Sequence, residues 1–512
     1  MREMPSANFL KVLMRRGRAI RDIPPNFLKV LVRSKRAVIG IAILVFFALL
    51  ALGAPLITPF SPIYSKQVIA APLAYPVWFK YIPGLADEKP SENLFPIEDP
   101  GFLHDTSVEQ WVFSTLPTGE GLTLRYVPDV GRPEGDLGSV AIDFQRDSAG
   151  SPEQVKAILT KEFYYPFEGP PKRFLGQIFT LVEGVRNVSL WGVEIKVFIQ
   201  RADEEPKYLW SAKQGGAYQS EAWITPNAYG DYFYPPLIDS YNLDQEKTTF
   251  SVQANYKYGV EIVFNEEVQR ASVYVDDLDL RLYGFCFGLL GTDNGGLDVF
   301  TQLAYGARIS LLVGVVATLL SVGIGLIVGL FAPYLGRVVD EVLMRFTDML
   351  LVIPELPLLL VLVAVLGPSI WNIIAIIGLL GWMGFARTVR SQTLSLKERA
   401  FVEAAKAVGA GKVHIITRHI LPNVMNLVYV TLAMSVPAAI MSEAYLSFLG
   451  LYDPFVMTWG RMLNEALELP GGFRRWWWIV PPGLCIAAIS ISFILMGYAL
   501  DEILNPKIRE RQ

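Results

Sequence analysis

The stretch GAGK, residues 409–412, contains the residue types of a nucleotide-binding loop. A P-loop needs the pattern GxxxxGK followed by Ser or Thr, because backbone N–H groups wrap the phosphates and the hydroxyl reaches Mg²⁺. Here Val413 follows Lys412, and Lys406 occupies the position of the first glycine. The loop therefore lacks a glycine and the hydroxyl that this chemistry requires. The sequence predicts no ATP site here and no catalytic residue elsewhere.

The segment that contains GAGK, residues 388–422, is a polar connection between two apolar stretches. Alanine and glutamate predict a helix up to the glycines, and KVHIITRHI is expected to resume as a helix that Pro422 ends. Gly409 permits a turn that few residues tolerate. A helix–turn–helix beside a membrane suits docking into another protein, whereas the alternative is an ordinary solvated loop. The features that favour docking are small or acidic side chains: Glu403, Ala404 and Ala405.

The composition is that of a membrane protein. Hydrophobic residues make up 52% of the 512-residue chain, and the mean hydropathy is +0.35. Apolar runs long enough to cross about 30 Å of hydrocarbon predict six transmembrane helices, at residues 37–60, 303–333, 339–366, 369–387, 423–448 and 476–500. The first run is too long for a signal peptide and lacks a clean small-residue cleavage site, so it is interpreted as an uncleaved anchor.

Basic residues gather in the N-terminal tail, around Arg337 and Arg345, in the 387–418 connection and in the C-terminal tail. If six spans alternate, all of these lie on one side, and the positive-inside tendency makes that side cytoplasmic. Residues 62–290 then face outward. They carry 19 Lys and Arg against 32 Asp and Glu, whereas the rest of the chain carries 26 against 17. The sequence thus predicts a multi-pass inner-membrane protein with cytoplasmic termini and no nucleic-acid partner.

Four parts are expected along the chain. Residues 1–36 repeat a basic amphipathic pattern, NFLKVLMRRGRAI and then NFLKVLVRSKRAV, that is typical of a segment lying on anionic membrane lipid. Docking of a cytoplasmic partner is the alternative for this segment. A first transmembrane helix at 37–60, an extracytoplasmic insert at 62–290 and a five-helix core at 291–512 follow. The predicted fold class is an α-helical membrane protein that carries an inserted, mainly-β domain.

The insert alternates apolar and polar residues over several short runs rich in β-branched and aromatic types. This pattern predicts an antiparallel sandwich or jelly roll. Residues 152–163 are expected to form one helix. Alternation places Asp277 and Asp279 on one strand face with Asp276 on the other, which favours solvated carboxylates over a Ca²⁺ site. No metal site is predicted.

Aromatic residues are abundant in the insert, and five of them are candidate recognition residues: Trp191, Trp210, Trp223, Tyr232 and Tyr234. Such rings could stack on sugar rings or on a partner protein, while core or rim packing is the alternative. The final run VYVDDLDLRLYG faintly resembles the last strand of jelly-roll carbohydrate-binding modules. The insert offers no plausible Ser–His pair and no Cys/His cluster, so it is not expected to be an enzyme.

Carboxylates within membrane spans are costly and are therefore candidates for a solute pathway: Asp348, Glu355 and Glu443. Pro354 and Pro357 flank Glu355 and could bend the helix toward a cavity. The alternative is a carboxylate satisfied by a neighbouring helix. Close helix packing is expected at four glycines of the second span: Gly314, Gly323, Gly325 and Gly329.

Several motifs, in order and at family spacing, resemble permease subunits of binding-protein-dependent ABC importers. The 388–422 connection resembles their EAA loop at six positions: Glu403, Ala404, Ala405, Gly409, His419 and Pro422. Residues 289–314, 420–451 and 459–466 resemble segments of the C-type subunit of dipeptide and oligopeptide permeases, and Glu443 matches a family position. The chain departs from the family at three places. It reads Gly-Leu-Asp at 296–298, where the family usually reads Gly-Arg-Asp, and it has Tyr498 where an acidic residue is usual. Most of 62–285 lacks a counterpart in the family.

The resemblance implies a transport subunit rather than an enzyme. Its connection would form coupling helices that seat in a groove of a cytoplasmic ATPase. The implied partners are a homologous second permease, two ATPase subunits that use ATP and Mg²⁺, and an extracytoplasmic solute-binding protein, while this chain would bind no cofactor. Peptides are the first solute class and oligosaccharides the alternative. A membrane-anchored envelope recognition protein is the rival from a different class.

Overall fold

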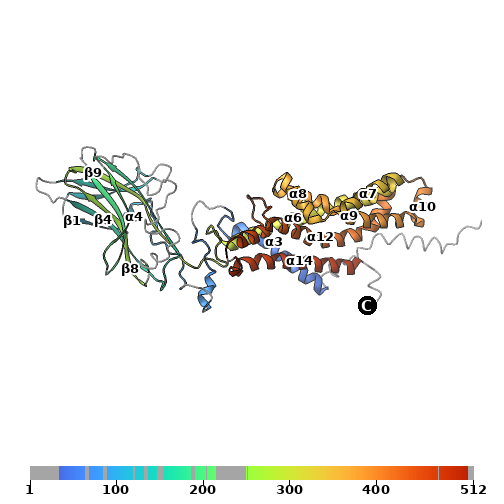
Figure 1. Ribbon diagram of the computed structural model, residues 1–512, viewed down its shortest axis with the longest axis horizontal. Coiled ribbons are helices and arrows are strands. Elements are labelled where there is room, and N and C mark those ends of the chain that lie inside the picture. The colour runs from blue at the N-terminus through green and yellow to red at the C-terminus, as the bar shows by residue number, and fades with distance from the viewer. Residues whose placement is uncertain are drawn as a thin grey trace, which may run out of the picture. The chain divides into compact units, whose positions relative to one another are not determined.

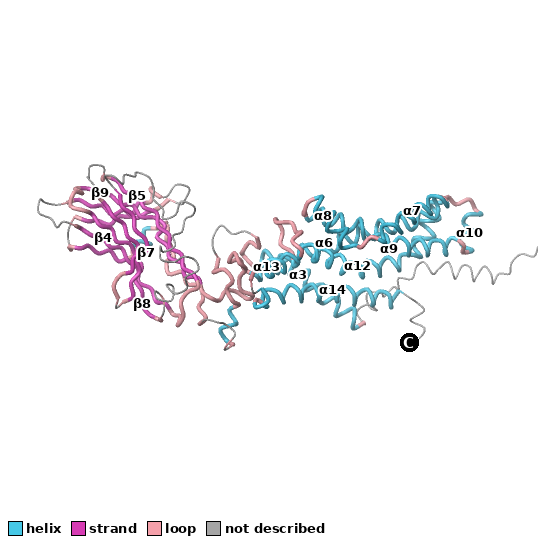
Figure 2. The backbone as a smooth tube through the Cα atoms, viewed as in Figure 1, coloured by secondary structure: helices cyan, strands magenta, loops and turns pink. Residues whose placement is uncertain are grey.

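The computed structural model describes residues 34–63, 69–82, 84, 89–118, 121–131, 137–146, 154–185, 191–202, 204–214, 250, 252–470 and 472–504. Contacts divide the chain into two compact units, one of Met1–Lys66 with Val299–Gln512 and one of Gln67–Asp298. The first unit is helical (Figure 1) and the second is built mainly of strands (Figure 2). Most of the expected N-terminal amphipathic segment, residues 1–33, lies outside the described residues.

The helical unit contains the apolar spans. In the described part of the chain, five helices are long and apolar enough to cross a membrane, or six if one bent pair counts as a single span. Its elements are α3 (Lys35–Ile57), α6 (Val299–Leu335), α7 (Arg337–Val352), α8 (Glu355–Leu366), α9 (Ile370–Lys397), α10 (Ala400–Ala407), α11 (Lys412–Ile415), the π-helix η3 (Ile416–Ile420), α12 (Leu421–Phe448), α13 (Trp459–Glu468), η4 (Gly472–Arg474) and α14 (Trp476–Leu504). α6 packs most extensively against α9, and α12 packs against α14 and α6.

Glycines of α6 bring neighbouring helices close, as predicted at three of the four positions. A Cβ placed on Gly329 would lie 2.6 Å from the Cβ of Val389 and 2.7 Å from the carbonyl oxygen of Ala386, both on α9. Gly325 and Gly314 are similarly crowded, by Trp382 and by Ile440. Gly323 differs, because a Cβ there would meet nothing within 4 Å among the described neighbours.

The third expected span, residues 339–366, is not one continuous helix. The structure divides it into α7 and α8, which meet at an angle of 92°. Pro354 explains the break, because the residue before a proline is driven out of the helical region. Ile353 accordingly adopts an extended conformation, with φ −74° and ψ 128°. The expectation of a bend near Glu355 is thus met by a sharp corner rather than by a gentle kink.

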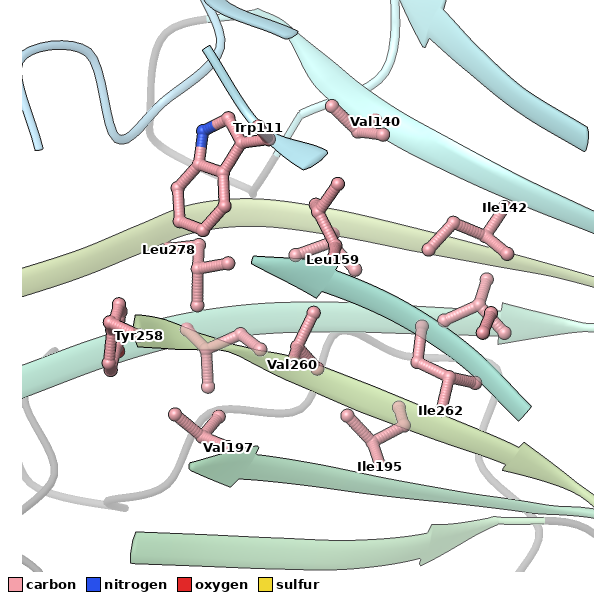
Figure 3. Packing of buried hydrophobic residues seen from close by; sticks show 14 of the residues in the cluster. Trp111, Val140, Ile142, Leu159, Ile195, Val197, Tyr258, Val260, Ile262 and Leu278 are labelled. Atoms are coloured by element: carbon pink, nitrogen blue, oxygen red, sulfur yellow. The ribbon is translucent and has the colours of Figure 1, made fainter. Parts of the chain in front are cut away.

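The strand unit consists of two antiparallel sheets. One has the order β1-β4-β8-β6-β7 and the other β2-β3-β9-β5. The elements are η2 (Val77–Tyr81), α4 (Asp105–Val108), β1 (Val112–Leu116), β2 (Leu122–Val127), β3 (Ser139–Gln145), β4 (Val155–Tyr165), β5 (Arg173–Glu183), β6 (Val193–Arg201), β7 (Lys207–Gln214), β8 (Ala254–Phe264) and β9 (Arg270–Tyr283). Inward side chains of both sheets form one hydrophobic core, in which Ile142 and Leu278 of the second sheet accompany Leu159 and Val260 of the first (Figure 3).

The helix expected at 152–163 is wrong, because the described part of this stretch lies in strand β4. Val155, Ala157 and Leu159 are buried, and the residues between them are only partly buried. This two-residue period fits a sheet with one face on the core, and it outweighs the helix preference of the Lys and Ala residues.

The predicted placement of the three aspartates on β9 is also wrong. The pairing of β5 with β9 shifts between Gln177 and Phe179, and Asp277 has φ +48°. This bulge reverses the alternation, so that Asp276 and Asp279 are both buried while Asp277 is half-buried. Arg281 Nε donates to Asp279 Oδ2 at 2.6 Å, yet burial still raises the pKa of the Asp279 carboxyl. Within the described residues, no group of three potential ligands could hold a metal ion.

The two ends of the strand unit are joined by hydrogen bonds. The Tyr75 N–H donates to the carbonyl of Phe285 at 2.7 Å, and the Thr292 N–H donates to that of Ala74 at 3.0 Å. The hydroxyl of Thr292 also bridges this junction, because it accepts from the Ala74 N–H at 2.8 Å and donates to the carbonyl of Ala71 at 2.6 Å. A unit whose ends meet can be inserted into a loop of another domain without separating that loop's two sides.

Candidate functional site

α10 ends in a tight turn at Gly409. The Ala410 N–H donates to the carbonyl of Ala405 at 3.0 Å, and the Gly409 N–H donates to that of Lys406 at 2.9 Å, which is the Schellman pattern. Gly409 has φ +88°, in the left-handed region, so the turn expected from the sequence is present. A Cβ on Gly409 would meet nothing within 4 Å among the described neighbours. The requirement for glycine is therefore conformational and not steric.

Gly409→Ala should loosen the last turn of α10. Holding alanine in the left-handed region costs about 1–2 kcal/mol, so amide exchange in α10 should accelerate about 5- to 30-fold. Gly411→Ala is the matched control, because Gly411 has equally open surroundings but a φ of −66° that alanine adopts freely. Hydrogen–deuterium exchange of the purified chain measures both. Equal acceleration in the two variants would contradict this assignment.

α10 has one buried side and one exposed side. Val402 is buried, and Ala405 packs against the same apolar cluster, which includes Val389 of α9 and Ile416 and Ile420 of η3. On the other side Glu403 and Ala404 are exposed, and the side chain of Val408 at the end of the helix is 90% exposed. Glu403 forms no ion pair with the described residues. An apolar and acidic surface that this chain leaves open suits contact with another protein.

Pro422 does not end the helix that follows the turn, contrary to the expectation. The helical path runs from Lys412 to Phe448, and Pro422 lies in the first turn of α12. Because proline has no N–H to donate to residue 418, the preceding turn widens into the π-helix η3. Within η3 the ring of His419 is half-buried, and its centroid lies 6.4 Å from that of Phe401 on α10. Pro422 thus shapes the stretch that presents His419.

Two lysines join this loop to the end of α6. Lys397 Nζ donates to the carbonyl of Pro333 at 2.8 Å, and Lys412 Nζ donates to that of Tyr334 at 3.2 Å. Helix carbonyls near a C-terminus lack intrahelical partners and carry partial negative charge, so lysines satisfy them well. The sequence analysis did not identify these contacts, because the partners lie 64 and 78 residues apart.

Asp348 is paired with a neighbouring helix. Its carboxylate accepts a hydrogen bond from the Arg387 guanidinium of α9. Asp340, nearer the start of α7, accepts hydrogen bonds from Arg390 Nε and Nη2, both at 2.6 Å. These two pairs hold α7 against α9, and they correspond to the alternative of a carboxylate satisfied by a neighbouring helix. Asp340 and its arginine were not identified from the sequence.

Glu355 lies at the first position of α8, immediately after the corner at Pro354, and its side chain is exposed. A carboxylate in the first turn is favoured by the partial positive charge of the helix N-terminus. No ion pair with another described residue involves it. Glu355 therefore remains a candidate for contact with a solute or a partner.

Glu443 is fully buried in α12. Its Oε1 accepts from the Ser447 hydroxyl at 2.6 Å, and the Thr458 hydroxyl donates to Ser447 Oγ at 3.5 Å. Thr458 also caps α13, since its Oγ1 accepts from the Arg461 N–H at 3.2 Å. This chain of hydrogen bonds joins α12 to α13. The sequence left two interpretations of Glu443 open, lining the solute pathway or bracing the helices around it. These contacts favour bracing.

Two of the five aromatic candidates lie in the described part of the insert. The ring of Trp191 is half-buried, and Lys213 Nζ lies 5.0 Å from its centroid. Trp210 on β7 packs against the core. Neither ring is a fully exposed platform, because each is already in contact with its own domain. Trp223, Tyr232 and Tyr234 lie outside the described residues.

Two protein-family models match the helical parts of the chain. Residues 321–510 match the binding-protein-dependent transport system inner membrane component, and residues 26–76 match the N-terminal TM domain of oligopeptide transport permease C. Residues 77–320 lie between the two matched segments. They include the strand unit almost entirely.

Among curated proteins, the dipeptide transport system permease protein DppC of Bacillus subtilis is 41% identical over 223 residues, which cover 43% of this chain and 68% of that protein. The oligopeptide transport system permease protein OppC of Haemophilus influenzae is 38% identical, over 44% and 71% of the two chains.

A solved structure from a study of carbohydrate-binding modules of the β-sandwich superfamily aligns with a TM-score of 0.22 and 13% identity. The alignment covers 36% of this chain and 61% of that chain, and it supports no conclusion. The two family models and the identity to the permeases establish the family without it. The chain belongs to the family of C-type permease subunits of dipeptide and oligopeptide ABC transporters.

Proposed function

We propose that this chain forms half of the translocation pathway of an ABC importer for peptides, and that it couples ATP hydrolysis in partner subunits to transport. The observation that carries the proposal is the open surface of α10. Glu403, Ala404 and Val408 are exposed beside the rigid turn at Gly409, while Val402 anchors the helix to the apolar cluster of α6, α9 and η3. Movement of α10 would therefore be transmitted directly to the spans.

The partners follow from family membership. The proposed assembly contains a homologous second permease, two cytoplasmic ATPase subunits that bind ATP and Mg²⁺, and an extracytoplasmic solute-binding protein. This chain itself would hold no nucleotide, because the GAGK stretch is a helix-ending turn without the serine or threonine that a P-loop needs.

The proposed topology has both termini and α10 in the cytoplasm and the strand unit outside. The charge distribution supports it, since residues 62–290 are acidic and the remainder is basic. The strand unit would be an extracytoplasmic β-sandwich, and the pairing of its two ends near Tyr75 and Phe285 is what an insertion after the first span requires. We assign it the docking of the solute-binding protein or control of access to the pathway.

Peptides are the proposed solutes, because the relatives are named as dipeptide and oligopeptide permeases. The membrane-anchored recognition protein is disfavoured, because one anchor would suffice for it. The described chain instead packs several apolar helices around α6 and leaves one face of α10 exposed.

Affinity purification of the tagged, full-length chain from its native membrane tests this function. The expected result is recovery of two ATPase subunits and a second permease, together with loss of labelled-peptide uptake in cells that lack this chain. Recovery of neither an ATPase nor a second permease, with uptake unchanged, would overturn the proposal in favour of an anchored recognition protein.

A further inference from the structure

A cavity of about 560 Å³ lies between the end of α6, the start of α7, the end of α9 and the α10–α11 turn. All of these elements belong to the helical unit. Four cations and one carboxylate are among the residues that line it: Arg337, Lys397, Lys406, Lys412 and Asp340. A pocket with such an excess of positive charge at the end of a membrane span is typical of a site for an anion.

Part of this charge is already used within the protein. Lys397 and Lys412 donate to the last carbonyls of α6, and Asp340 is held by both guanidinium contacts of Arg390. Arg337 and Lys406 differ, because their side chains are exposed and make no hydrogen bond or ion pair with any described residue. Two cations therefore face the cavity without an internal counter-charge.

Two further polar features near the cavity have no partner among the described residues. Tyr334 lines it, and the buried hydroxyl of this residue has no hydrogen-bond partner among the described residues. Gly336 precedes the 16-residue helix α7 and supplies no side-chain cap, so the first N–H groups of α7 are not satisfied by a cap. A helix N-terminus with uncapped N–H groups attracts a negative group. An anion with several acceptor oxygens would meet the two cations and the N–H groups of α7 at once.

Exposed hydrocarbon lies next to the lining residues along the chain, outside the lining itself. Leu335 at the end of α6 and Val338 in the first turn of α7 are 58% and 75% exposed, and Val342 one turn further is 61% exposed. A free inorganic anion makes no apolar contacts with these side chains, whereas the acyl chains of a lipid would cover them. We propose that the cavity binds the phosphodiester headgroup of an anionic membrane phospholipid, with Arg337 and Lys406 holding the phosphate.

This site would connect the lipid to α10 and its turn. Lys406 belongs to α10 and Ala410 to its turn, while Arg337 and Tyr334 belong to the ends of two membrane helices. A headgroup held between them adds a bridge beside the two lysine contacts to α6. The proposal does not depend on transport, because it concerns the binding of lipid to this chain alone.

Native mass spectrometry of the purified full-length chain with added phosphatidylglycerol tests the site. The double variant Arg337→Gln/Lys406→Gln is compared with Arg399→Gln/Arg418→Gln, which removes two exposed cations of the same loop that do not line the cavity. Each interfacial cation contributes roughly fivefold to affinity for anionic lipid. We therefore expect phosphatidylglycerol to bind the first variant about 25-fold more weakly than wild type and to bind the control nearly as well as wild type.

Two further arms identify the ligand. Phosphatidylcholine should not be retained, and an excess of inorganic phosphate should not displace phosphatidylglycerol, since phosphate lacks the acyl chains. Thermal unfolding without added lipid shows that both double variants are folded, as expected for exposed positions. Equal weakening in the two double variants, retention of phosphatidylcholine at the level of phosphatidylglycerol, or full displacement by inorganic phosphate would each overturn the proposal.

Discussion

Glu403→Arg is expected to abolish recovery of ATPase subunits with the purified chain, while leaving its fold and its second permease in place. Glu403 is exposed on α10 and has no ion-pair partner among the described residues, so reversing its charge costs little within this chain. At an interface with basic groups, the same reversal replaces attraction by repulsion. Such changes cost about 2–5 kcal/mol, which corresponds to a loss of affinity of about 30- to 5,000-fold.

Glu398→Arg is the matched control for this change. Glu398 is also an exposed glutamate of the loop, but it lies at the C-terminal cap of α9, before α10 begins. Co-purification followed by quantitative mass spectrometry compares the two variants with wild type. We expect Glu398→Arg to retain the ATPase subunits. If Glu403→Arg also retains them, the exposed face of α10 is not the surface that binds the ATPase. That outcome would leave the family membership of the chain unchanged.

The turn at the centre of the loop was predictable because it depends on local backbone chemistry. Gly409 is required by the left-handed conformation that ends α10, and a glycine after an alanine-rich helix indicates that conformation directly. Pro422 was misread for a related reason. A proline breaks hydrogen bonds only with the preceding turn, and a π-helical turn absorbed the missing N–H, so the helix continued.

The strands were predictable where one face is buried and the other is not. Within β4, however, composition was misleading, because alanine and lysine favour a helix while the alternation of Val155, Ala157 and Leu159 fits a sheet. The bulge at Asp277 could not be foreseen, since it depends on the pairing of β9 with β5, a strand about 100 residues earlier.

The contacts around the candidate site were the least predictable part. Opposite charges on α7 and α9 are visible in the sequence, but the pairing of Asp340 with Arg390 and of Asp348 with Arg387 depends on how the two helices are rotated. The burial of Glu443 against Ser447 is local and could be anticipated from their spacing of four residues, whereas the link through Thr458 requires the packing of α13.

Gly329→Ala is expected to lower the stability of the protein, whereas Gly323→Ala is not, although both add one methyl group to α6. At Gly329 the new Cβ would lie 2.7 Å from the carbonyl oxygen of Ala386 and 2.6 Å from the Cβ of Val389. Backbone atoms cannot rotate away, so α6 and α9 would have to separate. Overpacking of this kind costs about 1–3 kcal/mol, and Gly329→Leu should cost more and reduce the yield of folded protein.

At Gly323 the same methyl group would enter open space, with nothing within 4 Å among the described neighbours. Alanine is favoured over glycine inside a helix by about 0.5–1 kcal/mol, so Gly323→Ala should be neutral or stabilising. The midpoint of thermal unfolding in detergent, with the yield of monodisperse protein, measures both variants. A similar shift at the two positions would mean that the helix preference and not the α6–α9 contact controls stability there. The predicted difference between the two variants therefore isolates the α6–α9 contact that supports α10, because Val389 belongs to the same apolar cluster as Val402 of α10.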